Sequence, residues 1–168
     1  MDVEALLAEL YGRIEPLAHE VVDGLDADAL VEVPSSGANP IGWLIWHATR
    51  VQDHHVAEIL GADQVWVGDG WARHFGLEPD PSNTGYGHTA DQVAAVRPEG
   101  PGVLIGYLEA VGGRTRTLLE AVTPAELDRV VDRRWDPPVT LGVRLVSIAD
   151  DSLQHLGQAA YVRGLLTG

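Results

Sequence analysis

The 168-residue sequence predicts an all-α fold, a four-helix bundle with a long loop after the second helix. Four long stretches repeat apolar residues with the 3.6-residue period of a helix, and almost none shows the alternation of a strand. After the second stretch, residues 61–88 are irregular and rich in Gly and Pro, which would let the helices pack outside simple up-down order. No internal repeat or change in composition marks a boundary, so residues 1–168 are expected to form one domain.

The first helix is expected over residues 2–24, where apolar residues keep the helical period. Asp2 can cap its start, and Gly24 is a suitable end because glycine accepts the left-handed backbone of a C-terminal cap. Pro16 should kink or divide this helix, since proline has no N–H for the helical hydrogen bonds. Residues 26–38 then form a connection with room for one helical turn.

The second helix has the clearest start in the sequence. Asn39 is expected to cap it and Pro40 to occupy its first position, where the fixed φ of proline is favourable. The helix should run to about Leu60 and end at Gly61. Segment 61–88 is longer than an ordinary connection in a compact domain, so we expect it to be a binding loop or a lid.

Two further long helices are expected in the second half of the chain. Thr89 should cap a short helix that ends near Val96, and a long helix should follow over residues 101–122. Residues 130–135 fit a short extended segment. The final helix is predicted over residues 139–166, with an apolar stripe along one face.

Composition excludes several classes of function. The formal net charge is −14 and all 11 basic residues are arginine, so we expect no basic patch of the kind that binds nucleic acid or an anionic membrane surface. It contains no cysteine, which excludes disulfides, thiolate ligands to a metal and a cysteine nucleophile. The start of the sequence has no positively charged leader region, so we expect no signal peptide and a cytoplasmic protein.

Asp151 and His155 interrupt the apolar stripe of the last helix. Because they are four residues apart, they project side by side from one face. A carboxylate and an imidazole on an inward-facing stripe need partners, and a metal ion would provide them. His47 on the second helix is a further candidate, and a set of two His and one Asp leaves coordination positions open, as in catalytic metal sites. The same spacing also fits a His–Asp hydrogen bond or a partly exposed pair without a metal.

Two motifs surround these candidate ligands. The first is NPIGWLIWHATRVQDHH at residues 39–55, followed by QVW at residues 64–66, and the second is RLVSIADDSLQHLGQAAYVRG at residues 144–164. Together they resemble the DinB-like superfamily, and most closely its branch of mycothiol-dependent enzymes and low-molecular-weight thiol S-transferases. The resemblance extends over nearly the whole chain.

This resemblance implies a four-helix bundle that binds a divalent metal, zinc or nickel, through one His on the second helix and two residues four apart on the last. His47 and His155 match two of those ligands, and Asp151 stands where many members have the other His. An acidic residue at that place is similar to the ligand set of a mycothiol-dependent isomerase. The resemblance also implies mycothiol or a similar small thiol as co-substrate, its attack as a thiolate on a small electrophile, and a homodimer.

Other side chains are expected around the metal. His54, two turns after His47, is the candidate proton acceptor. Trp43 and Trp71 are candidates for an aromatic wall around the substrate, with core packing as the alternative, and Gln158 for a contact to a ligand or to substrate. A non-catalytic metal-binding or stress-associated bundle, a metal-dependent hydrolase and a thiol-dependent isomerase remain alternatives with the same residues.

Overall fold

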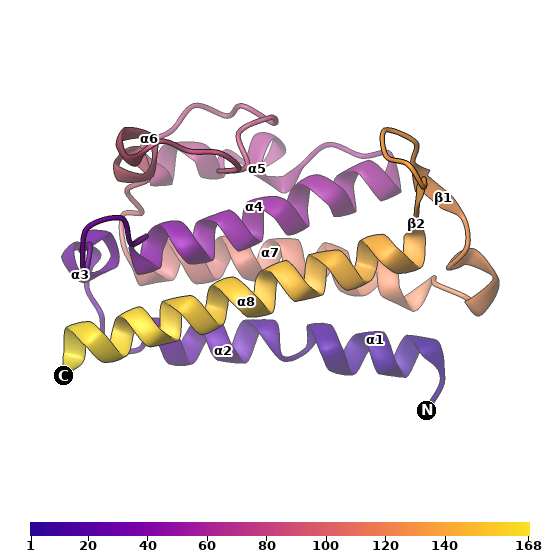
Figure 1. Ribbon diagram of the computed structural model, residues 1–168, viewed down its shortest axis with the longest axis horizontal. Helices are drawn as coiled ribbons and strands as arrows, with labels where there is room; N and C mark the ends of the chain where they lie inside the picture. Colours follow the sequence, from indigo (N-terminus) through magenta and orange to yellow (C-terminus); the bar gives the residue numbers. More distant parts are fainter.

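The computed structural model describes residues Met1–Gly168 and confirms the predicted helical bundle (Figure 1). One row of the bundle consists of two short helices in line, and the other three rows are single long helices. The rows are α1 (Val3–Tyr11) with α2 (Ile14–Val22), then α4 (Ile41–Leu60), α7 (Pro101–Glu120) and α8 (Leu141–Thr167). Helix α4 packs mainly against α8 and α7, while α2 packs against the same two helices.

The first row is divided, as the proline predicts. Asp2 caps α1 by accepting a hydrogen bond from the backbone N–H of Ala5 at 2.9 Å. The break falls at Gly12, so that Pro16 becomes the third residue of α2. At that position the missing N–H of proline removes no helical hydrogen bond.

The start of α4 differs from the prediction by one residue. Pro40 is the N-cap residue, with an extended backbone, and Asn39 makes no side-chain hydrogen bond, so the predicted Asn39 cap is wrong. Gly61 ends the helix in the left-handed conformation, as expected. The predicted turn before α4 is the short helix α3 (Ala27–Val31), which packs against α4.

The connection between α4 and α7 is more regular than the sequence indicates. It contains α5 (Val65–Gly68), the 3-10 helix η1 (Trp71–Phe75) and α6 (Ala90–Ala95), the last with the predicted Thr89 cap. This connection returns the chain to the end of the bundle where α4 begins, and α7 therefore runs parallel to α4 (Figure 1). The expected departure from up-down order is thus confirmed.

A small hairpin precedes α8 at the other end of the bundle (Figure 1). Strand β1 (Val130–Asp132) lies in the segment expected to be extended and pairs antiparallel with β2 (Val139–Thr140). The prediction had placed residue 139 in the final helix. Instead, Thr140 caps α8, whose first residue is Leu141. A short 3-10 helix, η2 (Pro124–Glu126), lies between α7 and the hairpin.

One hydrophobic core of 33 buried residues joins all four rows. Its largest fully buried side chains include Trp46, Trp66 and Tyr107, so two of the tryptophans of the first motif serve packing. None of the helices is long and apolar enough to cross a membrane.

Candidate metal centre

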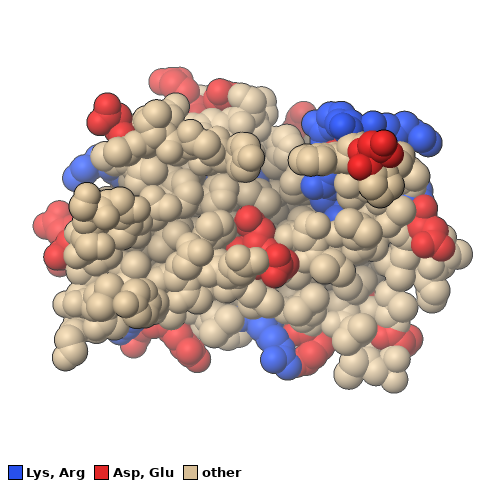
Figure 2. All heavy atoms as spheres, viewed as in Figure 1, with Lys and Arg blue, Asp and Glu red and all other residues tan.

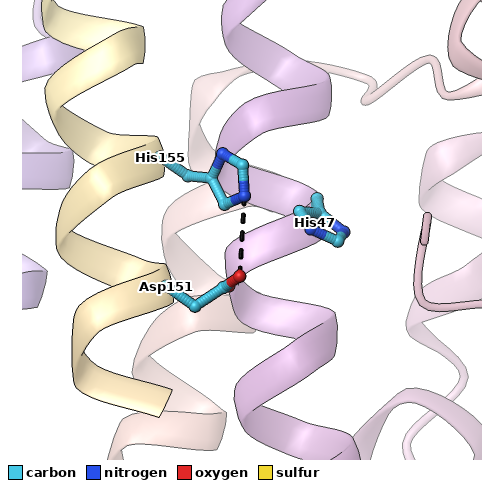
Figure 3. Close-up of side chains that lie close together, drawn as sticks. All are labelled: His47, Asp151 and His155. Carbon is cyan, nitrogen blue, oxygen red and sulfur yellow. Dashed lines mark ion pairs between the residues drawn. The ribbon is translucent and has the colours of Figure 1, made fainter. Parts of the chain in front are cut away.

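The three predicted ligands lie together between α4 and α8. His47 projects from α4, and Asp151 and His155 project from α8 toward it (Figure 3). One ligand atom from each of the three residues lies within 4.8 Å of the others. Two imidazoles and one carboxylate at this separation fit a divalent transition metal, since zinc binds nitrogen and oxygen ligands in this way.

His47 is buried and held by its Nδ1 atom. This atom lies 2.6 Å from the carbonyl oxygen of Thr84, which can only accept, so Nδ1 carries the hydrogen and Nε2 keeps its lone pair. The indole of Trp43 stacks on the ring, with centroids 4.7 Å apart and planes inclined by 11°. Burial lowers the pKa of His47, which favours the neutral form that binds a metal.

The Thr84 carbonyl reaches His47 because the next residue is a glycine. Gly85 has a φ of +91°, and a Cβ atom there would lie 2.8 Å from Nδ1 of His47 and 2.9 Å from the Trp46 ring. Any other side chain would therefore push the loop away from α4. The loop between α4 and α6 contributes backbone to the site through this contact.

His155 is held in the same way from its own helix. Its Nδ1 lies 3.0 Å from Oε1 of Gln158, so Gln158 contacts a candidate ligand. Its Nε2 lies 3.6 Å from Oδ1 of Asp151 (Figure 3). Asp151, and to a smaller extent Gln158, raise the pKa of His155, while burial opposes them. The negative charge that attracts a proton there would equally attract a metal cation.

Asp151 provides the test of whether a metal fits. Its second oxygen, Oδ2, is buried and has no hydrogen-bond partner in the structure. A buried carboxylate oxygen without a partner is costly, and a divalent cation beside the two free Nε2 atoms would satisfy it. The residues present therefore fit a metal.

We expect Gln158→Leu to weaken zinc binding by about 10–100-fold, the range seen when the outer partner of a metal-binding His is lost. Gln158 is exposed, so the fold should remain intact. Competition titration of zinc against a chelator measures the change. Gln154→Leu is the matched control because Gln154 is also exposed on α8 but bonds only Asp150. Equal affinities of the two variants would contradict the role of Gln158.

A cleft of about 670 Å³ lies beside the three ligands and is lined by His47 and Asp151. Its other walls come from the loop before α6, from the hairpin and from the first half of α8. Asp132, Arg134 and Arg144 line it on the hairpin side. The open coordination positions of a metal at this centre would thus be accessible to a small molecule.

His54 also lines the cleft, but its hydrogen bond assigns it a different role from the expected one. Gln64 accepts from Nη2 of Arg50 through Oε1, so its amide nitrogen faces Nδ1 of His54 at 3.1 Å. Nδ1 then accepts, and neutral His54 carries its hydrogen on Nε2. In this tautomer His54 is a hydrogen-bond donor rather than the predicted proton acceptor.

The two tryptophans predicted for the substrate wall do not line the cleft. Trp43 packs on His47 and donates from Nε1 to His88 Nδ1 at 3.2 Å, so it supports a ligand instead. Trp71 packs against Tyr107 of α7, with centroids 5.7 Å apart, and a Cβ on Gly106 would collide with it. The aromatic residues that do line the cleft are Tyr86 and Trp135, which are 92% and 65% exposed.

In a second group of potential ligands, His54, His55 and Glu58, two members contact an arginine. Its ligand atoms also lie within 4.8 Å of one another. However, Nη1 of Arg144 lies 3.2 Å from Nε2 of His55, and Arg134 donates to Glu58 at 2.9 Å. A second metal ion would have to compete with these two guanidinium groups for the same side chains, and the positive charge of the arginines disfavours a cation there.

Neutral His55 makes the stability of the fold sensitive to acid. Burial, together with the charge of Arg144, lowers its pKa from the ordinary 6.5 to about 4. Between these two values the unfolded chain binds a proton that the folded chain does not. We therefore expect the contribution of His55 to the free energy of unfolding to be at its maximum above pH 6.5. This contribution should fall as the pH is lowered toward 4.

Urea unfolding at about pH 7.5 and about pH 5 measures this dependence. His55→Gln should reduce the loss of stability between the two conditions, while His19→Gln, which replaces an exposed histidine of α2, should leave it unchanged. A variant without His55 that loses as much stability as the wild type would refute this explanation.

The residues to which the sequence analysis assigned no role lie in the hairpin and at the start of α8. Arg134 and Trp135 line the cleft but belong to neither motif, and Arg144, which also lines it, is the first residue of the second motif. The signal available in the sequence was the pair Arg133-Arg134 followed by Trp135 in an acidic chain, shortly before the helix that bears two ligands. That pattern becomes informative only when the hairpin is known to fold back over α4 and α8.

Comparison with known proteins supports the fold and the family. The chain matches a crystal structure described as the conserved protein of locus from Enterococcus faecalis, with a TM-score of 0.91 and 30% sequence identity. The match covers 100% of this chain and 99% of that one. No curated protein matches the sequence. The family profile of the DinB superfamily, which includes metal-dependent enzymes, matches residues 11–159. The chain therefore belongs to the DinB superfamily.

Proposed function

We propose that this protein is a divalent-metal-dependent S-transferase that activates a small thiol for attack on an electrophile. The observation that carries the proposal is the unpartnered Oδ2 of Asp151 beside two imidazoles, each fixed through Nδ1 by an oxygen acceptor. Three protein ligands next to an open cleft are the arrangement of a catalytic rather than a structural metal site. The thiol itself rests on the resemblance of the two motifs to thiol-dependent members of the superfamily.

Zinc fits the ligand set best, with nickel as the second candidate. Two imidazole nitrogens and one carboxylate oxygen are common zinc ligands, and imidazole also suits nickel. A divalent ion at this place would lower the pKa of a bound thiol, so that the thiol ionises at neutral pH. The chain has no cysteine, so the sulfur must come from a separate thiol such as mycothiol.

The residues of the chain position the reactants. The Thr84 carbonyl and the Gln158 side chain contact the Nδ1 atoms of the two histidines, which leaves both Nε2 atoms free to bind a metal. The cleft holds the electrophile, and the N–H of His54 can donate to an oxygen of that molecule. The sulfur forms its bond to the electrophilic carbon as the leaving group departs with the bonding electrons, and the thiol proton passes to water through the open cleft.

Loss of free thiol in the presence of zinc-loaded protein tests this function. Several low-molecular-weight thiols, mycothiol among them, are combined with a panel of electrophiles, and His47→Ala serves as the variant without a site. We expect thiol consumption that needs both metal and His47. A protein that holds no stoichiometric metal after reconstitution, or shows no thiol consumption, would refute the proposal. Metal-dependent consumption of an electrophile without thiol would identify a hydrolase instead.

A further inference from the structure

Arginine side chains gather around the hairpin in a protein that is otherwise acidic. Four of the 11 arginines lie between residues 129 and 144, although the chain carries a formal charge of −14. Figure 2 shows basic side chains concentrated over the end of the molecule where β1 and β2 lie, with acidic groups spread over the rest of this face. Two of these arginines, Arg134 and Arg144, line the cleft beside the metal centre.

Arg134 is held rigidly but has an unused edge. Its Nε and Nη2 atoms donate to the two oxygens of Asp132, each at 2.9 Å, and Nη2 also donates to Glu58 at 2.9 Å. Its Nη1 atom has no partner in the protein, and the side chain is 64% exposed. A planar guanidinium fixed by two carboxylates loses little conformational entropy when it binds an anion through its remaining N–H groups.

Arg144 supports this position from within the fold. It is largely buried, donates from Nη2 to Asp132 at 2.7 Å and leaves its Nε atom without a partner. Asp132 thus neutralises part of two guanidinium charges, and these contacts hold its pKa well below the usual value. The cleft is lined by two arginines and two aspartates, so it is neutral without a metal and carries two positive charges with a divalent ion.

The remaining wall is aromatic and exposed. Trp135 follows Arg134 directly, and Tyr86 lies in the loop that also supplies Thr84 to the metal centre; both line the cleft. Exposed aromatic side chains of this size, next to a guanidinium with free N–H groups, provide an apolar surface and a charged contact for one ligand.

We propose that the cleft binds a co-substrate that carries a carboxylate next to an apolar or aromatic group, with Arg134 holding the carboxylate and Trp135 covering the apolar part. The inference rests on the proposed function in placing the reactive end of that molecule at the metal centre. The anion contact itself depends only on the hairpin and the cleft.

Binding of phenylacetate and of its neutral isostere phenylacetamide tests the anion site. Metal-free protein is used so that no ion can hold the carboxylate, and binding is followed by NMR at the indole N–H of Trp135. We expect wild-type protein to bind phenylacetate at least about tenfold more tightly, the effect of one charge-assisted contact. Arg134→Gln should remove this preference and leave phenylacetamide binding unchanged, which also shows that the cleft is intact.

Arg133→Gln is the matched control. It removes the same charge one residue earlier, but Arg133 is exposed and does not line the cleft. The control should keep the preference for the carboxylate. Equal binding of the two probes by wild-type protein, or an equal loss in Arg133→Gln and Arg134→Gln, would overturn the anion site.

Turnover separates this inference from the transferase itself. With zinc-loaded protein, an electrophile with a carboxylate should show a KM at least about tenfold below that of its amide, and Arg134→Gln should raise the KM of the acid alone. Equal KM values for acid and amide would overturn the anion site and retain the transferase. A carboxylate preference in binding without thiol-dependent turnover would overturn the transferase and retain the anion site.

Discussion

Asp151→Asn is expected to lower zinc affinity by more than about 100-fold, a larger effect than the loss of an outer partner of a ligand. The substitution keeps the size of the side chain but removes the charge and one of the two carboxylate oxygens. Asp151 is the only acidic member of the candidate ligand set, so its loss leaves two neutral imidazoles to hold a divalent cation. The same change removes the carboxylate that raises the pKa of His155.

Competition titration with a chelator measures the affinity, and thermal unfolding with and without zinc provides a second readout. Zinc should raise the unfolding temperature of wild-type protein, because an ion that binds only the folded state stabilises it, but not that of Asp151→Asn. Without zinc, Asp151→Asn should unfold at no lower temperature than wild-type protein, since Oδ2 has no protein partner to lose and the substitution removes a buried charge. Asp150→Asn is the matched control, because Asp150 is exposed and bonds Gln154. Wild-type zinc affinity in Asp151→Asn would refute the metal centre.

Local features of the sequence were sufficient to predict most helices and half of the site. The helical period of apolar residues depends on one helix at a time, and Asp151 and His155 share a face because they lie four residues apart on α8. The division of the first row follows from Pro16, although the chain breaks before that residue rather than at it. Placing His47 opposite them required the resemblance of the two motifs, because no spacing within one helix shows which helices meet.

The remaining half of the site depends on contacts between distant segments. The Thr84 carbonyl reaches His47 across 37 residues, and it does so only because Gly85 can approach α4 closely. Such a contact leaves no periodic trace in the sequence. The second strand of the hairpin and its pairing with β1 were missed for a related reason. Strand β2 has two residues, too few to show an alternating pattern, and its pairing is what carries Arg134 to the cleft.

Arg50 explains how the loop that supports His47 is held. This arginine is fully buried, and its guanidinium stacks over Trp66 at 5.0 Å from the ring centroid. It donates to the carbonyl of Asn83 at 3.0 Å and to that of Pro81 at 3.1 Å, just before Thr84 in the chain. A buried charge therefore ties the loop to α4 next to the residue that fixes the candidate ligand.

The same guanidinium contacts a buried carboxylate. Nη1 of Arg50 lies 3.4 Å from Oδ2 of Asp53. This Oδ2 also accepts from the Tyr107 hydroxyl and from the backbone N–H of Trp66, and the other oxygen, Oδ1, accepts from the backbone N–H of Val65. Removing one partner of a buried ion pair leaves an uncompensated charge, which costs about 3–5 kcal/mol. Loss of the two loop carbonyl contacts adds to that cost.

Arg50→Met is therefore expected to lower the free energy of unfolding by about 3–5 kcal/mol, measured by urea denaturation at neutral pH. Arg13→Met is the control: Arg13 forms an exposed i,i+4 pair with Glu9, and its loss should cost less than about 1 kcal/mol.

Arg50→Lys keeps the charge but not the planar fork, so it should recover only part of the stability. Without Arg50 the loop is no longer bound to α4, and His47 loses its hydrogen bond to the Thr84 carbonyl. The folded fraction of Arg50→Met should therefore also bind zinc more weakly. Unchanged stability would mean that the loop is positioned without Arg50, whereas lost stability with wild-type zinc affinity would separate the loop from the metal centre.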